Sequence, residues 1–231
     1  MAVLPDASPL DNPAWAALTG SQARFAERHG RAARYQADVT PFFATSGEPG
    51  DEVWHDVAKL AGPGAVAAIF GVERPPPEGW EVVDRIHGVQ LVDVGVVPAE
   101  APEAVRLGAA DVPEMLDLVE RTQPGPFRPR TVELGTYLGI RQRGALVAMA
   151  GERMRPPGWS EISAVCTDPA YRGRGLATRL VLAVAAKIRD RGETPMLHTS
   201  ADNTNAIRLY ESLGFALRRK IEFLAVRAPA M

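Results

Sequence analysis

Two glycines and three arginines lie in and around the turn of the segment YRGRGLATRL, residues 171–180. A β-like run that ends at Thr167 precedes the segment, and the residues after Gly175 have the apolar spacing of a helix. A helix N-terminus presents unpaired backbone N–H groups and the positive end of its dipole, and glycines let the backbone approach a ligand closely. This strand-to-helix turn therefore predicts a site for a phosphate or pyrophosphate group.

Two familiar phosphate motifs do not fit this turn. A P-loop needs Lys and then Ser or Thr after its second glycine, but Leu176 and Ala177 follow Gly175. A dinucleotide fingerprint needs three glycines at fixed offsets and an acidic residue at the end of the next strand, and neither is present. A Gly-x-Gly pair before a helix is also compatible with an ordinary turn, so the choice between a turn and a phosphate site depends on the rest of the chain.

The composition excludes several classes of function. The formal net charge of −2 over 231 residues gives no global basic field for nucleic acid or a membrane surface. The longest apolar run, residues 180–186, is too short to cross a bilayer, and the N-terminus does not resemble a signal peptide. With the single cysteine, Cys166, and four scattered histidines, we expect no disulfide, no metal site and a cytoplasmic location.

Proline- and glycine-rich stretches divide the chain, and the stretch at residues 96–104 separates two different patterns. We therefore expect an N-terminal part, 1–100, and a C-terminal part, 101–231. In the first part the pattern predicts helices over 15–34 and 51–62 and strands over 65–72 and 89–97. In the second it predicts strands over 104–109, 137–154 (a hairpin around Arg143 and Gly144), 160–169, 194–200 and 216–226, and helices over 111–122, 175–191 and 203–214.

Two motifs of the C-terminal part together resemble the GNAT superfamily of N-acetyltransferases. Arg172-Gly-Arg-Gly175-Leu-Ala177 matches its signature Gln/Arg-x-x-Gly-x-Gly/Ala. The segment NTNAIRLYESLGF, residues 203–215, resembles its second signature, Asn-x-x-Ala-x-x-Leu-Tyr-x-x-x-Gly-Phe. It departs at one point, because Ala206 directly follows Asn205, so either Asn203 or Asn205 takes the place of the family's asparagine.

The resemblance covers residues 103–226 and implies an α/β fold of the GNAT type. This fold has a mixed, mostly antiparallel sheet whose central strands splay apart, and acetyl-CoA lies between the strands at 161–167 and 194–200. The pattern of residues 137–167 is also similar to the branch that contains glycine N-acyltransferase-like proteins. In that branch a smaller, degenerate GNAT-like half precedes the catalytic domain, which would account for residues 1–100.

The resemblance also implies roles for individual residues. Tyr210 takes the position of the general acid, and Glu161 that of a general base that acts directly or through water, with Glu152 as the second candidate. Cys166 and His198 are read as packed strand residues without a chemical role of their own. The residues expected to bind the cofactor are Val165, Cys166, Thr167, Arg172, Gly173, Arg174, Gly175, Leu176, Ala177, Asn203 and Asn205.

The function that follows is acetyl transfer from acetyl-CoA to a primary amine, by direct attack in a ternary complex. The acceptor is a small molecule or a peptide or protein amine, and the loop 122–135, with Arg128 and Arg130, is expected to form one wall of its cleft. Two alternatives remain: a non-catalytic acyl-CoA-binding or sensor module, and an acyltransferase for a longer acyl group. The sequence determines neither the acceptor nor the oligomeric state.

Overall fold

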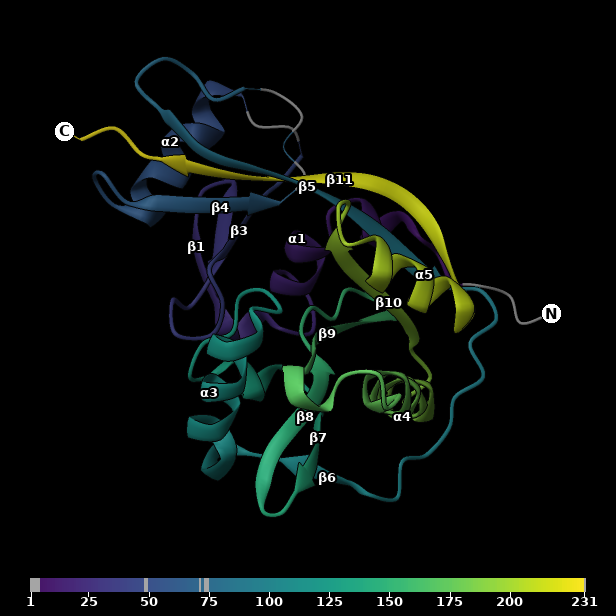
Figure 1. The fold of residues 1–231 in the computed structure, drawn as a ribbon. Helices are drawn as coiled ribbons and strands as arrows, with labels where there is room; N and C mark the ends of the chain where they lie inside the picture. Colours follow the sequence, from purple (N-terminus) through teal and green to yellow (C-terminus); the bar gives the residue numbers. More distant parts are fainter. Residues whose placement is uncertain (1–4, 48–49, 71, 73–74, 231) are drawn as a thin grey trace.

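The computed structural model describes residues 5–47, 50–70, 72 and 75–230. Its strands form one sheet with the order β1-β2-β3-β4-β11-β5-β10-β9-β8-β7-β6 (Figure 1). Neighbouring strands are antiparallel except for β3 with β4 and β9 with β10, so the described sheet is mixed and mostly antiparallel. The strands are β1 Ala26–His29, β2 Ala32–Tyr35, β3 Phe42–Thr45, β4 Val66–Phe70, β5 Glu81–Asp93, β6 Ala104–Leu107, β7 Tyr137–Gln142, β8 Ala145–Glu152, β9 Trp159–Thr167, β10 Thr194–Ser200 and β11 Phe215–Arg227.

In the described part of the chain, five α-helices pack around this sheet. They are α1 Pro13–Leu18, α2 Asp51–Ala61, α3 Val112–Thr122, α4 Leu176–Asp190 and α5 Thr204–Ser212. None of the helices that the structure describes has the length and apolar character needed to cross a membrane.

The two long strands β5 and β11 tie the N-terminal and C-terminal parts into one sheet. β5 pairs with β10 on one side and with β11 on the other, and β11 also pairs with β4. Each part thus places its last strand beside a strand of the other part. The unit β3-α2-β4, two parallel strands joined through a helix, repeats the order of β9-α4-β10. This repeat supports a GNAT-like N-terminal half, which stays a prediction, as does the division at residue 100.

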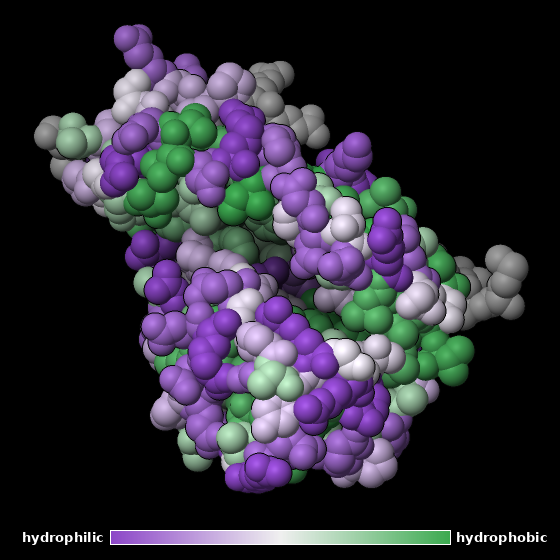
Figure 2. Space-filling model, viewed as in Figure 1, coloured by the Kyte–Doolittle hydropathy of each residue, from purple (hydrophilic) through white to green (hydrophobic). Residues whose placement is uncertain are grey.

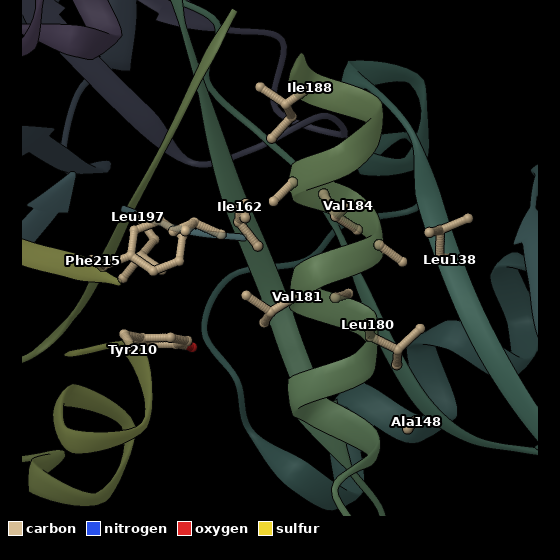
Figure 3. Close-up of a cluster of buried hydrophobic side chains, with 14 of the residues drawn as sticks. Leu138, Ala148, Ile162, Leu180, Val181, Val184, Ile188, Leu197, Tyr210 and Phe215 are labelled. Atoms are coloured by element: carbon tan, nitrogen blue, oxygen red, sulfur yellow. The ribbon is translucent and has the colours of Figure 1, made fainter. Parts of the chain in front are cut away.

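Helix α4 packs on the half of the sheet that carries the glycine-rich turn. Its apolar residues recur at helical spacing, so one face meets the strands while the other meets water. Figure 3 shows Leu180, Val184 and Ile188 on α4, with strand residues such as Ile162 and Leu138 around the helix. Tyr210 and Phe215 lie at the edge of the same cluster, with ring centroids 6.2 Å apart. This packing fixes the start of α4 relative to β9 and β10.

Most of the expected elements are present, but the helix predicted over residues 15–34 is wrong. α1 ends at Leu18, and residues 26–35 form the β1–β2 hairpin instead. The hairpin turns at Gly30, whose φ of +51° is in the region that favours glycine. The helical spacing of apolar residues was misleading here, because β2 is buried against its neighbours, with Ala33 and Tyr35 inside the core.

The shared sheet predicts how the chain behaves when it is cut. We expect that cleavage at a protease site inserted after Val97, in the connection between β5 and β6, leaves the two fragments associated, since β5 pairs with both β10 and β11. Gel filtration of the cut protein should give one peak at the position of the uncut control. Denaturant should be needed to separate the fragments, and two separately eluting folded fragments would contradict the shared sheet.

Candidate functional site

Strands β9 and β10 pair only over their first halves. The parallel register runs from Trp159 opposite Thr194 to Ile162 opposite Leu197 and then stops, although both strands continue. Ala164, two residues beyond the last pair, has a φ of +52°, where an L-residue is strained. Beyond this point the facing edges of the two strands no longer bond to each other, so their backbone groups are free to bind a ligand. The splay expected between these strands is present.

The glycine-rich turn lies just beyond β9 and opens α4. Gly173 and Gly175 have φ values of +75° and +71°, and a Cβ added at either would meet no atom within 4 Å. Gly175 caps α4 without a side-chain hydrogen bond, and the first turn of α4 carries no acidic residue. The first N–H groups of the helix therefore point at open space with the positive end of the dipole behind them. Anions are favoured there.

A cavity of about 970 Å³ joins this turn to the split between the strands. Figure 2 shows the molecule hollowed between its upper lobe and its lower body. The cavity volume is at the large end of the range for ligand sites, about 300–1,000 Å³. The residues predicted from the sequence that line it are Val165, Cys166, Thr167, Arg172, Gly173, Gly175, Leu176, Ala177, Asn203, Asn205 and Tyr210.

Two of the predicted site residues, Arg174 and Glu161, are not among the residues that line this cavity. The guanidinium carbon of Arg174 lies 4.9 Å from the ring centroid of Tyr171. Glu161 is completely buried beneath the split.

Tyr210 reaches the cavity from α5. Its ring is buried, with 7% exposed, and burial raises the pKa of the phenol to about 12. In Figure 3 its hydroxyl points away from α5 toward α4. Asn203 accepts a hydrogen bond from the N–H of Ala206 and so caps α5 at the cavity edge. Asn205 lies in the first turn of the same helix.

Cys166 and Thr167 line the cavity from the end of β9. Burial raises the pKa of the Cys166 thiol to about 11, so the thiol stays protonated and is a poor nucleophile at neutral pH. The Thr167 hydroxyl is buried and has no hydrogen-bond partner in the described structure. An unpaired buried hydroxyl is costly, which favours a ligand that bonds to it.

The Glu161 carboxylate is held from two sides. Arg153 donates to both of its oxygens, at 2.6 and 2.9 Å, and Nδ1 of His198 lies 2.8 Å from one of them. Burial by itself would raise the pKa of Glu161, but the neighbouring Arg153 and His198 hold it well below the usual range. The carboxylate is therefore ionised and a weak proton acceptor.

The imidazole of His198 lines the cavity and is fixed at both nitrogens. Its Nε2 lies 2.9 Å from the side-chain nitrogen of Gln90, whose oxygen accepts a hydrogen bond from Arg218. With Gln90 oriented in this way, its NH₂ donates to Nε2, and the proton of a neutral imidazole lies on Nδ1, toward Glu161. His198 was expected to be a packed strand residue, and its contacts agree with a structural role.

Glu152, the second candidate base, lies on the other face of the sheet. Its carboxylate is fully buried, pairs with Arg191 and accepts a hydrogen bond from Ser160 at 3.2 Å. It is not among the cavity-lining residues.

The residues that form the opposite end of the cavity were not predicted from the sequence. They come from β3, β4 and β5 of the N-terminal part, from β11, and from Arg153 after β8. No local motif marks them, because long-range strand pairing brings them together. The expected wall from the loop 122–135 is present in part: residues 122–126 line the cavity, but Arg128 and Arg130 do not. Arg130 instead pairs with Asp38 and Glu133.

Sequence comparisons relate the C-terminal part to acetyltransferases. The family model described as FR47-like protein matches residues 137–224. N-alpha-acetyltransferase RimI of Mycobacterium tuberculosis is 39% identical over 90 residues, 36% of this chain and 56% of RimI. A mycothiol acetyltransferase of Nocardia farcinica is 32% identical over 174 residues, 66% of this chain and 56% of the relative. The chain spans about half the length of these two curated relatives.

A structural comparison extends the match to nearly the whole chain. The crystal structure of a GNAT-family protein from Novosphingobium aromaticivorans aligns with a TM-score of 0.88 and 39% identity, covering 96% of this chain and 99% of that one. A GCN5-related N-acetyltransferase from Kribbella flavida shares the fold, with a TM-score of 0.61, 20% identity and coverage of 94% and 95%. On the full-length similarity to the Novosphingobium protein, the chain belongs to the GNAT family.

Proposed function

We propose that the chain is an acetyl-CoA-dependent N-acetyltransferase that acts on a primary amine. The observation that carries this proposal is one cavity that contains both the anion-binding turn at the start of α4 and the Tyr210 hydroxyl at the split of β9 and β10. The names of the two sequence relatives, a RimI N-alpha-acetyltransferase and a mycothiol acetyltransferase, support this reaction class. The same proposal includes a cytoplasmic location for the chain and a small-molecule or peptide acceptor.

The described residues fit acetyl-CoA, which supplies an activated acetyl thioester when it is bound. Residues 173–177 offer backbone N–H groups to the pyrophosphate, and the unpaired Thr167 hydroxyl offers a partner for a polar group of the pantetheine arm. The equivalent helix of the N-terminal part, α2, has Asp51 and Glu52 in its first turn, which repel phosphate. We therefore assign the cofactor to α4 and not to α2.

The proposed reaction requires few side-chain groups. A neutral amine attacks the carbonyl carbon, the C–N bond forms, and the C–S bond breaks. Tyr210 donates its phenolic proton to the departing sulfur, and the proton released by the amine leaves through water and restores the phenol. The raised pKa keeps Tyr210 protonated until the thiolate develops. The cavity extends from the turn to the strands of the N-terminal part, which is consistent with the two substrates binding side by side, as direct transfer requires.

In this proposal Glu161 is a positioning residue. It does not line the cavity, its carboxylate is engaged by Arg153 and His198, and its pKa is depressed. Those contacts favour a positioning role, in which Glu161 holds the strands together below the split. They disfavour the role of general base that was expected from the sequence. Glu152 is equally engaged on the other face.

The cofactor turn is tested by Gly175→Asp. The substitution places a carboxylate and a Cβ where the phosphates approach, so we expect acetyl-CoA affinity to fall at least tenfold, about 1.4 kcal/mol. Gly192→Asp is a matched control, because Gly192 follows the other end of α4 with a φ of +76° and equal open space. Calorimetry with acetyl-CoA should separate the two variants, and equal affinities would refute the assignment.

The general acid is tested by Tyr210→Phe, which removes one oxygen and keeps the ring packing. We expect acetyl-CoA affinity and melting temperature to stay unchanged while turnover falls on the order of 10²-fold. Tyr171→Phe, at another tyrosine that lines the cavity, serves as the control. If chemistry limits the rate and the Tyr210 variant stays within about threefold of wild type, the hydroxyl is not the acid.

The positioning role of Glu161 predicts a pH-dependent stability difference. Glu161→Gln leaves Arg153 buried without its countercharge, so we expect a loss of about 3 kcal/mol of unfolding free energy at neutral pH. Because the pKa of Glu161 is depressed in the folded state, its ionisation stabilises the protein at pH values above the pKa of an ordinary glutamate. This stabilisation is lost as the pH falls below about 4.3. The difference between wild type and variant should therefore shrink toward acid pH.

Denaturant unfolding at several pH values measures this difference. Glu133→Gln is the control, since Glu133 pairs with Arg130 at the surface and such pairs contribute little. A Glu161 variant as stable as wild type at neutral pH would count against the positioning role.

A further inference from the structure

The end of the cavity away from the glycine-rich turn is an apolar wall of two aromatic rings and three aliphatic side chains. Phe42 and Phe223 lie with ring centroids 5.8 Å apart, and Phe223 pairs across the strands with Ile86. The next rung holds Ala225 opposite Ala68. All five side chains line the cavity, and we call them the apolar wall: Phe42, Ala68, Ile86, Phe223 and Ala225.

No acidic side chain belongs to the apolar wall itself, but Asp84 lies next to it on β5, opposite Ala225 of β11. Among the described residues that line the whole cavity, none is Asp or Glu. Arg153 lines the cavity beside the wall, and its guanidinium carbon lies 4.8 Å from the centroid of the Phe42 ring. Its charge is compensated by the bidentate pair with Glu161. The lining beside the two rings therefore offers apolar carbon and a compensated arginine, so an apolar group is favoured there over a charged one.

The position of the apolar wall fits the acceptor better than the acyl group. The cofactor turn belongs to α4, whereas the wall belongs to the upper lobe with β3 and β4, above the split in the view of Figure 1. Ile86 is 47% exposed, so the wall is open to solvent. An acceptor can enter along this open wall while the cofactor occupies the turn below, as direct transfer in a ternary complex requires.

We propose that the acceptor is a primary amine that carries an aromatic or branched aliphatic group, and that this group binds against the apolar wall. The proposal rests on the function proposed above and names its substrate class. It also gives the N-terminal part a role, because β3, β4 and β5 contribute Phe42, Ala68 and Ile86 to the site. Burial of the apolar group against these side chains provides the affinity.

A panel of amines with acetyl-CoA tests the class. We expect kcat/KM for phenethylamine and isoamylamine to exceed that for ethylamine by about 100-fold, the size of effect that a few carbons have in an apolar pocket. Putrescine and glucosamine, which carry no aromatic or branched aliphatic group, should react far less well than phenethylamine. Comparable or higher values for putrescine or glucosamine would overturn the proposal.

A pair of variants on β5 tests the location. Ile86→Glu puts a carboxylate on the apolar wall, so kcat/KM for phenethylamine should fall about tenfold or more while that for putrescine rises. Val82→Glu is the matched control, since Val82 lies on the same strand with 42% exposed and does not line the cavity. Both variants should keep wild-type affinity for acetyl-CoA. Equal effects of the two substitutions would overturn the assignment to the wall.

Two further measurements separate this proposal from the proposed function. Calorimetric titration of phenethylamine into the CoA-saturated protein should show binding that Ile86→Glu weakens and Val82→Glu does not. If binding behaves so but no amine turns over, the wall is supported and the transferase function fails; if phenethylamine does not bind, the wall assignment fails. A comparison of the transfer rates with acetyl-CoA and hexanoyl-CoA tests whether the wall instead binds the acyl chain. If Ile86→Glu selectively impairs hexanoyl transfer, the wall binds the acyl chain and the proposal is wrong.

Discussion

The architecture of the site depends on one buried carboxylate. Glu161 lies at the second-to-last rung of the short β9–β10 ladder, and Arg153 and His198 reach it from the neighbouring segments on either side. A buried charge is tolerated only with such partners, so the three side chains require the strands to stay together at this level. One rung later the ladder ends and the cavity begins. The split is thus positioned from below by an ion pair as well as by the strained backbone at Ala164.

The same polar network joins the two parts of the chain. From His198 it continues to Gln90 on β5, which also donates to the carbonyl oxygen of Leu10, and from Gln90 to Arg218 on β11. Since every member is buried or half-buried and has a partner, moving β5 relative to β10 would leave several polar groups unsatisfied. Three of the five apolar-wall residues lie on β5 and β11, so this network also fixes their distance from the split between β9 and β10.

What the sequence predicted correctly depends on local signals. The glycine-rich turn, α4 and α5 are marked by glycines at positive φ, by an asparagine cap and by helical periodicity within a few residues. The burial of Glu161 and the formation of the apolar wall depend on the pairing of β5 and β11 with strands of the other part of the chain. No sequence pattern near Ile86 or Phe223 indicates that pairing. The error over residues 15–34 has the same origin, because the β1–β2 hairpin is stabilised by packing in the sheet and not by its own periodicity.

The absence of acidic side chains from the described cavity lining also bears on the proton balance of the proposed reaction. Most ammonium groups have pKa values near 10, so at neutral pH only a small fraction of the acceptor is the attacking, neutral form. Glu161 and Glu152 are both engaged in ion pairs away from the cavity, and no other carboxylate of the described residues lines it. An apolar wall selects the neutral amine by itself, since desolvation disfavours the charged form. Choice of acceptor and deprotonation are then one property of the apolar wall, and in the proposed reaction Tyr210 is the cavity-lining side chain that donates a proton.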